Sequence, residues 1–121
     1  EVVLELDKVL IAFAVNHLAQ VASLAAIAAR DEVRAVVDRI TAERDRVVAA
    51  LRAGGWDLPD AHANFVYLPL GPRTDVVFHE MERRGVVVRP FPAVGMRVTI
   101  GTPAENDRFL ATLAAVTTAG T

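Results

Sequence analysis

Apolar and polar positions follow a helical period over the first half of the chain. Over residues 31–53 apolar side chains fall at positions 33, 36, 37, 40, 47, 48 and 51, which form a helical stripe, and charged side chains take the opposite face, so an amphipathic helix is predicted. The glycine pair Gly54-Gly55 predicts its end, because glycine readily adopts the left-handed conformation of a helix cap. The alanine-rich residues 17–29 predict an earlier helix, whose small side chains suit burial against a neighbouring domain or subunit.

Shorter patterns in the second half predict alternating strands and helices. Strands are expected over residues 63–70, 86–89 and 96–101, and helices over residues 74–84 and from residue 103 onward. Thr74 is expected to cap the first of these helices, and Gly85 to end it. Thr102 and Glu105 form a capping box with Pro103 at the first helical position. The predicted fold class is α+β: a small, mostly antiparallel sheet with helices on one face, preceded by two N-terminal helices.

One arginine lies in the middle of the last predicted strand. Met96, Val98 and Ile100 alternate onto one face, so Arg97 and Thr99 point to the other. A guanidinium on a rigid strand is a planar fork that suits a carboxylate or a phosphate. An arginine on the solvated face of a half-buried sheet is the alternative interpretation.

Composition indicates one domain and excludes several classes of function. The chain has 121 residues, a net charge of -2 and no cysteine, so it has no basic footprint for nucleic acid and can form neither a disulfide nor a thiolate metal site. The mean hydropathy of +0.33 is high for a free-standing domain. Residues 9–29 carry no formal charge, but Asn16, His17, Gln20 and Ser23 interrupt them, so we expect no membrane span.

Four landmarks in order give the chain a resemblance to a known family. They are Leu6-Asp7-Lys8-Val9 with Phe13, Val15-Asn16 and Leu18-Ala19-Gln20; Ala63-Asn64-Phe65-Val66; Arg89-Pro90-Phe91 with Gly95 through Gly101; and Pro103 through Phe109. Together they resemble the C-terminal small domain of the fold-type-I aminotransferases that depend on pyridoxal 5'-phosphate, and most of all the histidinol-phosphate and aromatic-amino-acid group. The resemblance implies that residues 1–121 form this domain, with residues 1–30 connecting it to a large domain and residues 31–121 forming the small domain proper.

The same resemblance implies a function and a site. The full-length protein is expected to be a cytoplasmic, homodimeric aminotransferase that moves an amino group between histidinol phosphate or an aromatic amino acid and 2-oxoglutarate. Arg97 is expected to bind the carboxylate or phosphate of the substrate, and Arg89 to supply a second positive charge. The link over residues 90–95, which Pro90 and Pro92 keep out of the sheet, is expected to be a mobile rim, with Phe91 as an apolar wall.

The cofactor lysine of this family has no counterpart in the chain. Lys8 is the one lysine, and it has neither the preceding serine nor the following glycine-rich run of the family's Schiff-base lysine. We therefore interpret Lys8 as a surface residue and expect the cofactor lysine to lie upstream of Glu1. The chain does not begin with methionine, and we expect it to be a fragment that is inactive when isolated.

Two other classes of function stay open. The order strand-helix-strand-strand-helix from Asn64 onward also suits a ferredoxin-like regulatory module that would use Arg97 to clamp a small ligand. The apolar helices suit a structural dimerisation domain. Residues 1–62 match the aminotransferase connecting segment and have no purpose in the regulatory module, and a scaffold does not require Arg97. The sequence does not select the amino donor.

Overall fold

The computed structural model describes residues 3, 5, 8–9 and 14–118 of the chain. It divides into two compact units, Glu1–Ala35 and Val36–Thr121, which are described separately. The resemblance landmarks Leu6, Asp7 and Phe13 lie outside the described residues. Within the described part, no helix has both the length and the apolar character that crossing a membrane requires.

The first unit contains helix α2 (His17–Ala28), as the alanine-rich pattern predicts. Its start is fixed by Asn16, whose side-chain Oδ1 accepts a hydrogen bond from the backbone N–H of Ala19 at 2.9 Å. No residue of α2 is buried, and Leu18 is 79% exposed. The predicted packing of this helix on a neighbouring domain or subunit therefore stays a prediction.

Helix α3 (Arg30–Ala53) confirms the amphipathic pattern and crosses the boundary between the units. Its buried residues, Val47 and Leu51, both lie in its second half, whereas Val36 and Val37 are exposed. The apolar stripe is thus covered at only one end of the helix. After Ala53 the chain turns at Gly55, which has a φ of 86° and so takes the left-handed conformation that the sequence predicts.

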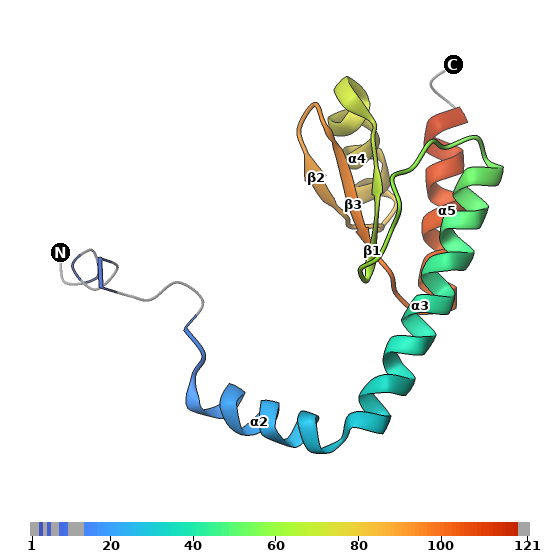
Figure 1. Ribbon diagram of the computed structural model, residues 1–121. Helices are drawn as coiled ribbons and strands as arrows, with labels where there is room; N and C mark the ends of the chain where they lie inside the picture. The colour runs from blue at the N-terminus through green and yellow to red at the C-terminus, as the bar shows by residue number, and fades with distance from the viewer. Residues whose placement is uncertain (1–2, 4, 6–7, 10–13, 119–121) are drawn as a thin grey trace. The chain divides into compact units, whose positions relative to one another are not determined.

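The second unit is built on a three-stranded antiparallel sheet (Figure 1). Its strands are β1 (Phe65–Leu68), β2 (Arg89–Phe91) and β3 (Gly95–Thr99), in the spatial order β1-β3-β2. The register places Tyr67 opposite Arg97 on one side of β3 and Arg89 opposite Arg97 on the other. The sheet confirms the predicted α+β class, although β1 and β3 are shorter than their patterns suggest.

The position of β2 corrects the prediction of a strand over residues 86–89. Val86 donates its backbone N–H to the Met81 carbonyl at 3.0 Å, which ties the start of this segment to helix α4 (Thr74–Arg83) rather than to β3. Pro90 lies inside the strand, opposite Met96, and was wrongly expected to stay out of it. Because β2 is an edge strand and Met96 directs its backbone groups toward β1, the missing N–H of Pro90 breaks no ladder bond.

One face of the sheet is covered by the helices. Strand side chains Val66, Leu68, Met96 and Val98 share a hydrophobic core with residues of α3, α4 and α5 (Pro103–Thr118). The helix residues in that core are Val47 and Leu51 of α3, Val77 and Met81 of α4, and Phe109, Leu113 and Val116 of α5. Burying such a side chain contributes roughly 1.5–3 kcal/mol to the stability of the fold. The helices therefore cover the apolar face of the sheet, and the opposite face stays open.

Two helix starts test the capping predictions. At α5 the capping box is confirmed: Thr102 donates its backbone N–H to Glu105 Oε2 at 2.8 Å, and the Glu105 N–H donates to Thr102 Oγ1 at 3.4 Å. At α4 the predicted cap is wrong, because Thr74 is itself the first helical residue. Its fully buried hydroxyl donates to the Gly71 carbonyl at 2.7 Å, across the short 3-10 helix η1 (Gly71–Arg73).

Candidate functional site

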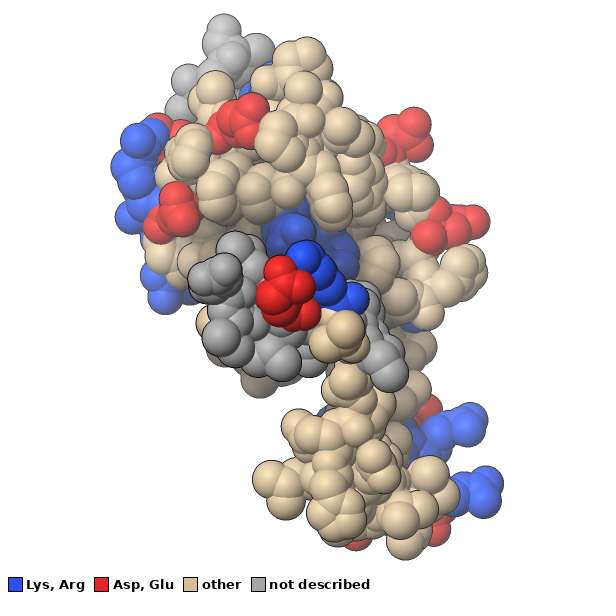
Figure 2. Space-filling model, turned by 90° about the vertical axis from the view of Figure 1, so that its left-hand side faces the viewer, with Lys and Arg blue, Asp and Glu red and all other residues tan. Residues whose placement is uncertain are grey.

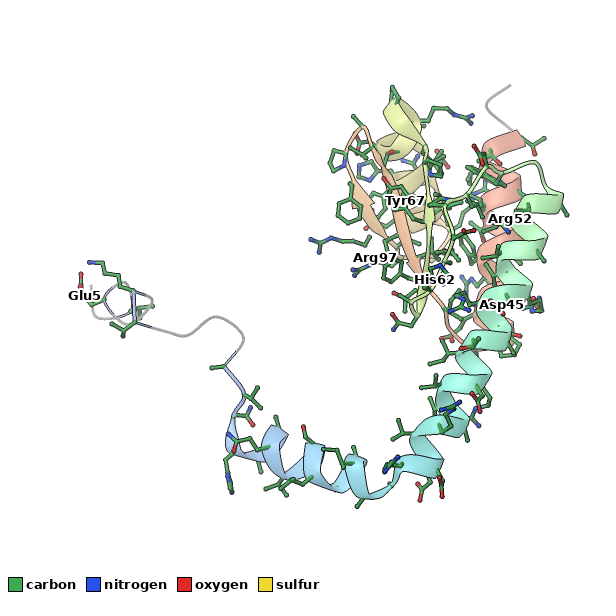
Figure 3. The ribbon with its side chains drawn as sticks, in the orientation of Figure 1. Glu5, Asp45, Arg52, His62, Tyr67 and Arg97 are labelled. Atoms are coloured by element: carbon green, nitrogen blue, oxygen red, sulfur yellow. The ribbon has the colours of Figure 1, made fainter. Side chains whose placement is uncertain are left out.

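Arg97 lies at the centre of β3 and points away from the core. Met96 and Val98 on either side of it are buried, whereas Arg97 and Thr99 are exposed. Figure 3 shows the Arg97 side chain leaving the sheet on the side away from α5. The strand alternation therefore places this guanidinium as the sequence predicts, on the face that the helices of the second unit leave open.

Arg89 faces Arg97 directly across the sheet. The two residues are partners in the β2–β3 register, and both are exposed. Like charges opposite one another destabilise a sheet. Among the described residues, neither arginine forms an ion pair with a carboxylate. The two positive charges predicted for the site are thus brought together without an acid to neutralise them, an arrangement that favours an anionic ligand.

Aromatic rings surround the two arginines on the same face. The Cζ atom of Arg97 lies 5.3 Å from the ring centroid of Phe65, and the rings of Tyr67 and Phe91 have centroids 6.3 Å apart. Figure 3 labels Tyr67 and Arg97 on neighbouring strands. Of these rings, only Phe91 was expected at the site from the sequence; Phe65 and Tyr67 were not. The alternation of Phe65 and Tyr67 with buried Val66 and Leu68 is a signal that could have found them.

A groove of about 580 Å³ opens beside the arginines. It lies where residues 86–88 separate from β3, and the charged residues of its lining are Arg89, Arg97, Arg108 and one acid, Glu105. The Glu105 carboxylate is engaged by Thr102 at the start of α5 and forms no ion pair with these arginines. Arg108 is held in place, because its Nη2 donates to the Arg84 carbonyl at 2.9 Å. The volume is within the range of small-molecule sites.

The link at the far end of the β2–β3 hairpin is shorter than predicted. Phe91 belongs to β2 and Gly95 to β3, so only three residues, 92–94, connect the strands. The Val94 N–H donates to the Phe91 carbonyl at 2.9 Å, and Ala93 has a φ of 58°. The rim is a tight turn, and its mobility stays a prediction.

Charged groups away from the arginines serve the fold. Arg46 of α3 pairs with Glu43 at 3.0 Å and with Asp107 of α5 at 2.8 Å. The hydrogen bonds from Arg46 and from Asn106 hold the pKa of Glu43 below its ordinary value. The hydrogen bonds to Glu43 and to Asp107 raise the pKa of Arg46. The hydrogen bonds from Thr102 likewise lower the pKa of Glu105. Figure 2 shows both basic and acidic side chains in its view.

The described residues do not fit the attachment of a pyridoxal phosphate cofactor. The amine of Lys8 is paired with Glu5 at 2.7 Å, and both side chains are two-thirds exposed. This agrees with the interpretation of Lys8 as a surface residue. No group of histidine, aspartate or glutamate side chains in the described part could hold a metal ion. The chemistry that these residues can perform is the binding and orientation of an anion.

Comparisons with known proteins agree with the architecture. The family model described as aminotransferase class I and II matches residues 1–113. The chain is 51% identical to an aromatic amino acid aminotransferase of Rhodococcus jostii and 49% identical to one of Mycolicibacterium paratuberculosis. Each match spans 110 residues, which is 91% of this chain but 31% of the relative.

A solved structure is also similar to this chain. A Burkholderia pseudomallei protein assigned as an aminotransferase superposes with a TM-score of 0.68 at 29% identity, over 75% of this chain and 29% of that one. The chain spans about a third of the length of the relatives that it matches. It belongs to the class I and II aminotransferase family.

Proposed function

We propose that this chain is part of a pyridoxal-phosphate-dependent aminotransferase that moves an amino group between an aromatic amino acid and a 2-oxo acid. The observation that carries the proposal is the acid-free arginine pair on the open face of the sheet, in a chain whose family model spans residues 1–113. The names of the relatives in Rhodococcus and Mycolicibacterium favour an aromatic donor over histidinol phosphate. For the acceptor, 2-oxoglutarate is the family-level expectation.

In this proposal Arg97 binds the substrate carboxylate. Its guanidinium is planar and carries parallel N–H donors, so it can hold a carboxylate by two hydrogen bonds and fix its orientation. Fixing a remote group turns binding energy into alignment of the reacting bonds. Pyridoxal phosphate, bound by the rest of the protein, would supply the capacity to accept and return the amino group.

Arg89 and the neighbouring rings would act on the rest of the substrate. Arg89 keeps the local field positive, which favours a second anionic group such as the distal carboxylate of an oxo acid. Phe91 is 39% exposed and packs against Tyr67, so an apolar surface is available close to the charge. Homodimer assembly and a cytoplasmic location are part of the same proposal and rest on the family resemblance alone.

The alternatives lose support from the extent of the family match. The match includes residues 1–62, which a ferredoxin-like regulatory module does not require. A dimerisation domain does not require two opposed arginines without an acid. Histidinol phosphate stays the second candidate donor, because Arg89 could equally receive its phosphate.

The test uses the full-length protein loaded with pyridoxal phosphate. Phenylalanine, tyrosine, tryptophan and histidinol phosphate are added in turn, and the absorbance of the bound cofactor is followed. We expect a change with the aromatic donors at lower concentration than with histidinol phosphate. The reverse order would replace the aromatic donor with histidinol phosphate, and a protein that never binds the cofactor would refute the proposal.

The role of Arg97 is tested by Arg97→Lys in the same protein. Losing one charge-assisted hydrogen bond costs about 1.5–3 kcal/mol, so we expect kcat/KM to fall about 10- to 100-fold while cofactor retention is unchanged. Arg73→Lys is the matched control, because Arg73 is exposed in η1 and lies outside the site. Equal loss of substrate use and cofactor would show that Arg97 is structural.

A further inference from the structure

Arg97 contacts the aromatic ring of Phe65 rather than a carboxylate of any described residue. The guanidinium carbon lies 5.3 Å from the centroid of the ring, within the range of a cation–π interaction. No carboxylate in the described part pairs with Arg97. A ring attracts the positive charge without accepting its N–H groups. The partner that orients this guanidinium therefore leaves its donors available to a ligand.

The backbone around Phe65 fixes the ring relative to Arg97. Phe65 is opposite Thr99 in the register, which makes it the diagonal neighbour of Arg97, a separation that an aromatic ring and a long side chain can bridge. Immediately before the strand, the Asn64 carbonyl accepts the Ile100 N–H at 2.9 Å. The start of β1 is thus attached to β3 close to the ring.

The Phe65 ring also borders an open space. A cavity of about 300 Å³, lined by residues 59–63 together with Phe65 and Tyr67, lies next to it. Phe65 is half-buried, so its environment has room for a hydroxyl group. A tyrosine at this position should fold, which makes it a conservative variant that keeps the ring.

We propose that Phe65 is a positioning residue, which holds the Arg97 guanidinium in place for the substrate carboxylate by the face of its ring. This inference rests on the proposed function, since it assumes that Arg97 binds that carboxylate. An acid in the same place would orient the guanidinium but compete with the substrate for its donors. The aromatic face orients it without competition, so less side-chain entropy is lost when the substrate binds.

The experiment compares Phe65→Leu and Phe65→Tyr in the full-length protein loaded with its cofactor. Leucine keeps the apolar bulk and removes the ring, whereas tyrosine keeps the ring. Two quantities are measured: KM and kcat with the best amino donor, and the dissociation constant of 3-phenylpropanoate. That probe has a carboxylate and an aromatic ring but no amino group to transfer, so it reports binding separately from turnover.

We expect Phe65→Leu to raise KM and the dissociation constant about two- to fivefold with kcat little changed, and Phe65→Tyr to restore both. Phe78→Leu is the matched control, because this half-buried phenylalanine of α4 packs against the core rather than against Arg97. It should lower the unfolding temperature without changing KM. If Phe65→Leu and Phe78→Leu have the same effect on binding, the positioning role is refuted.

The outcome separates this inference from the one on which it rests. If Arg97→Lys weakens binding of the probe and Phe65→Leu does not, Arg97 keeps its proposed role and the ring has none. If neither substitution changes binding, the carboxylate site itself is wrong.

Discussion

Asn106 is the buried polar residue whose substitution should lower the free energy of unfolding of the second unit most. It is 3% exposed, at the start of α5, and its side chain satisfies three groups. Its Oδ1 accepts the Gly101 N–H at 3.0 Å, and its Nδ2 donates to the Gly101 carbonyl at 3.0 Å and to Glu43 Oε2 at 2.9 Å. This one side chain therefore joins the link between β3 and α5 to α5, and α5 to α3.

The substitution Asn106→Leu removes all three hydrogen bonds and keeps the branched shape and the number of non-hydrogen atoms of the side chain. The two bonds to the Gly101 backbone are worth about 0.5–1.5 kcal/mol each, and their polar groups would lose their partner inside the structure. Leucine has the better helix propensity by roughly half a kcal/mol, which offsets part of the loss. Glu43 keeps its ion pair with Arg46 when the third bond is lost, so the two bonds to Gly101 are the main loss, and we expect the free energy of unfolding to fall by about 1–3 kcal/mol.

Urea unfolding at neutral pH measures this difference, with an unchanged m-value showing that the two-state comparison holds. Asn106→Asp separates the acceptor from the donor, because it keeps Oδ1 and replaces Nδ2 by an oxygen that faces Glu43. That repulsion raises the pKa of the new carboxyl in the folded state, so its destabilising effect should weaken as the pH falls. A change below about 0.5 kcal/mol for Asn106→Leu would refute the structural role of this network.

Two further substitutions test the hairpin and the start of α5. In Gly95→Ala, the added Cβ would lie against the Leu68 carbonyl and 2.5 Å from the Tyr67 hydroxyl. We therefore expect the free energy of unfolding, measured with urea, to fall by about 1–3 kcal/mol. An unchanged unfolding midpoint would show that β1 and β3 can move apart at no cost in free energy. In Glu105→Gln, the cap is kept and the charge removed. The pKa of Glu105 is lowered in the folded state, so its charge stabilises the fold above the ordinary value of 4.5 and this contribution is lost as the pH falls through the folded pKa. The variant should therefore lose less stability than the parent on acidification, and parallel pH curves would contradict this.

Local features of the fold could be predicted because their causes are local. The end of α3 depends on a glycine with positive φ, and the start of α5 depends on a capping box four residues long. The orientation of Arg97 depends only on strand alternation. Each of these is determined by neighbours in the sequence, so the pattern of residue types is sufficient.

The errors came from features that depend on distant partners. Pro90 can lie inside β2 only because β3, rather than β2, is the central strand, and no local pattern states the strand order. The bond from Asn106 to Glu43 joins residues 63 positions apart. Thr74 is a different case, because its partner is local: the 3-10 helix η1 precedes α4, so the Thr74 hydroxyl bonds to the Gly71 carbonyl three residues earlier instead of capping α4.

The open face of the sheet has features that suit the binding role that we propose for it better than they suit stability. Arg89 and Arg97 lie opposite one another, and the repulsion between their charges lowers the stability of the sheet. A carboxylate at a neighbouring position would restore that stability. The face instead provides aromatic rings, among them Phe65 beside Arg97, and these leave the guanidinium donors available. A solvated sheet surface needs neither the opposed charges nor the rings. An anion that carries an apolar group would complement both features at once, and this complementarity is one of the reasons for which we propose an aromatic amino acid as the substrate.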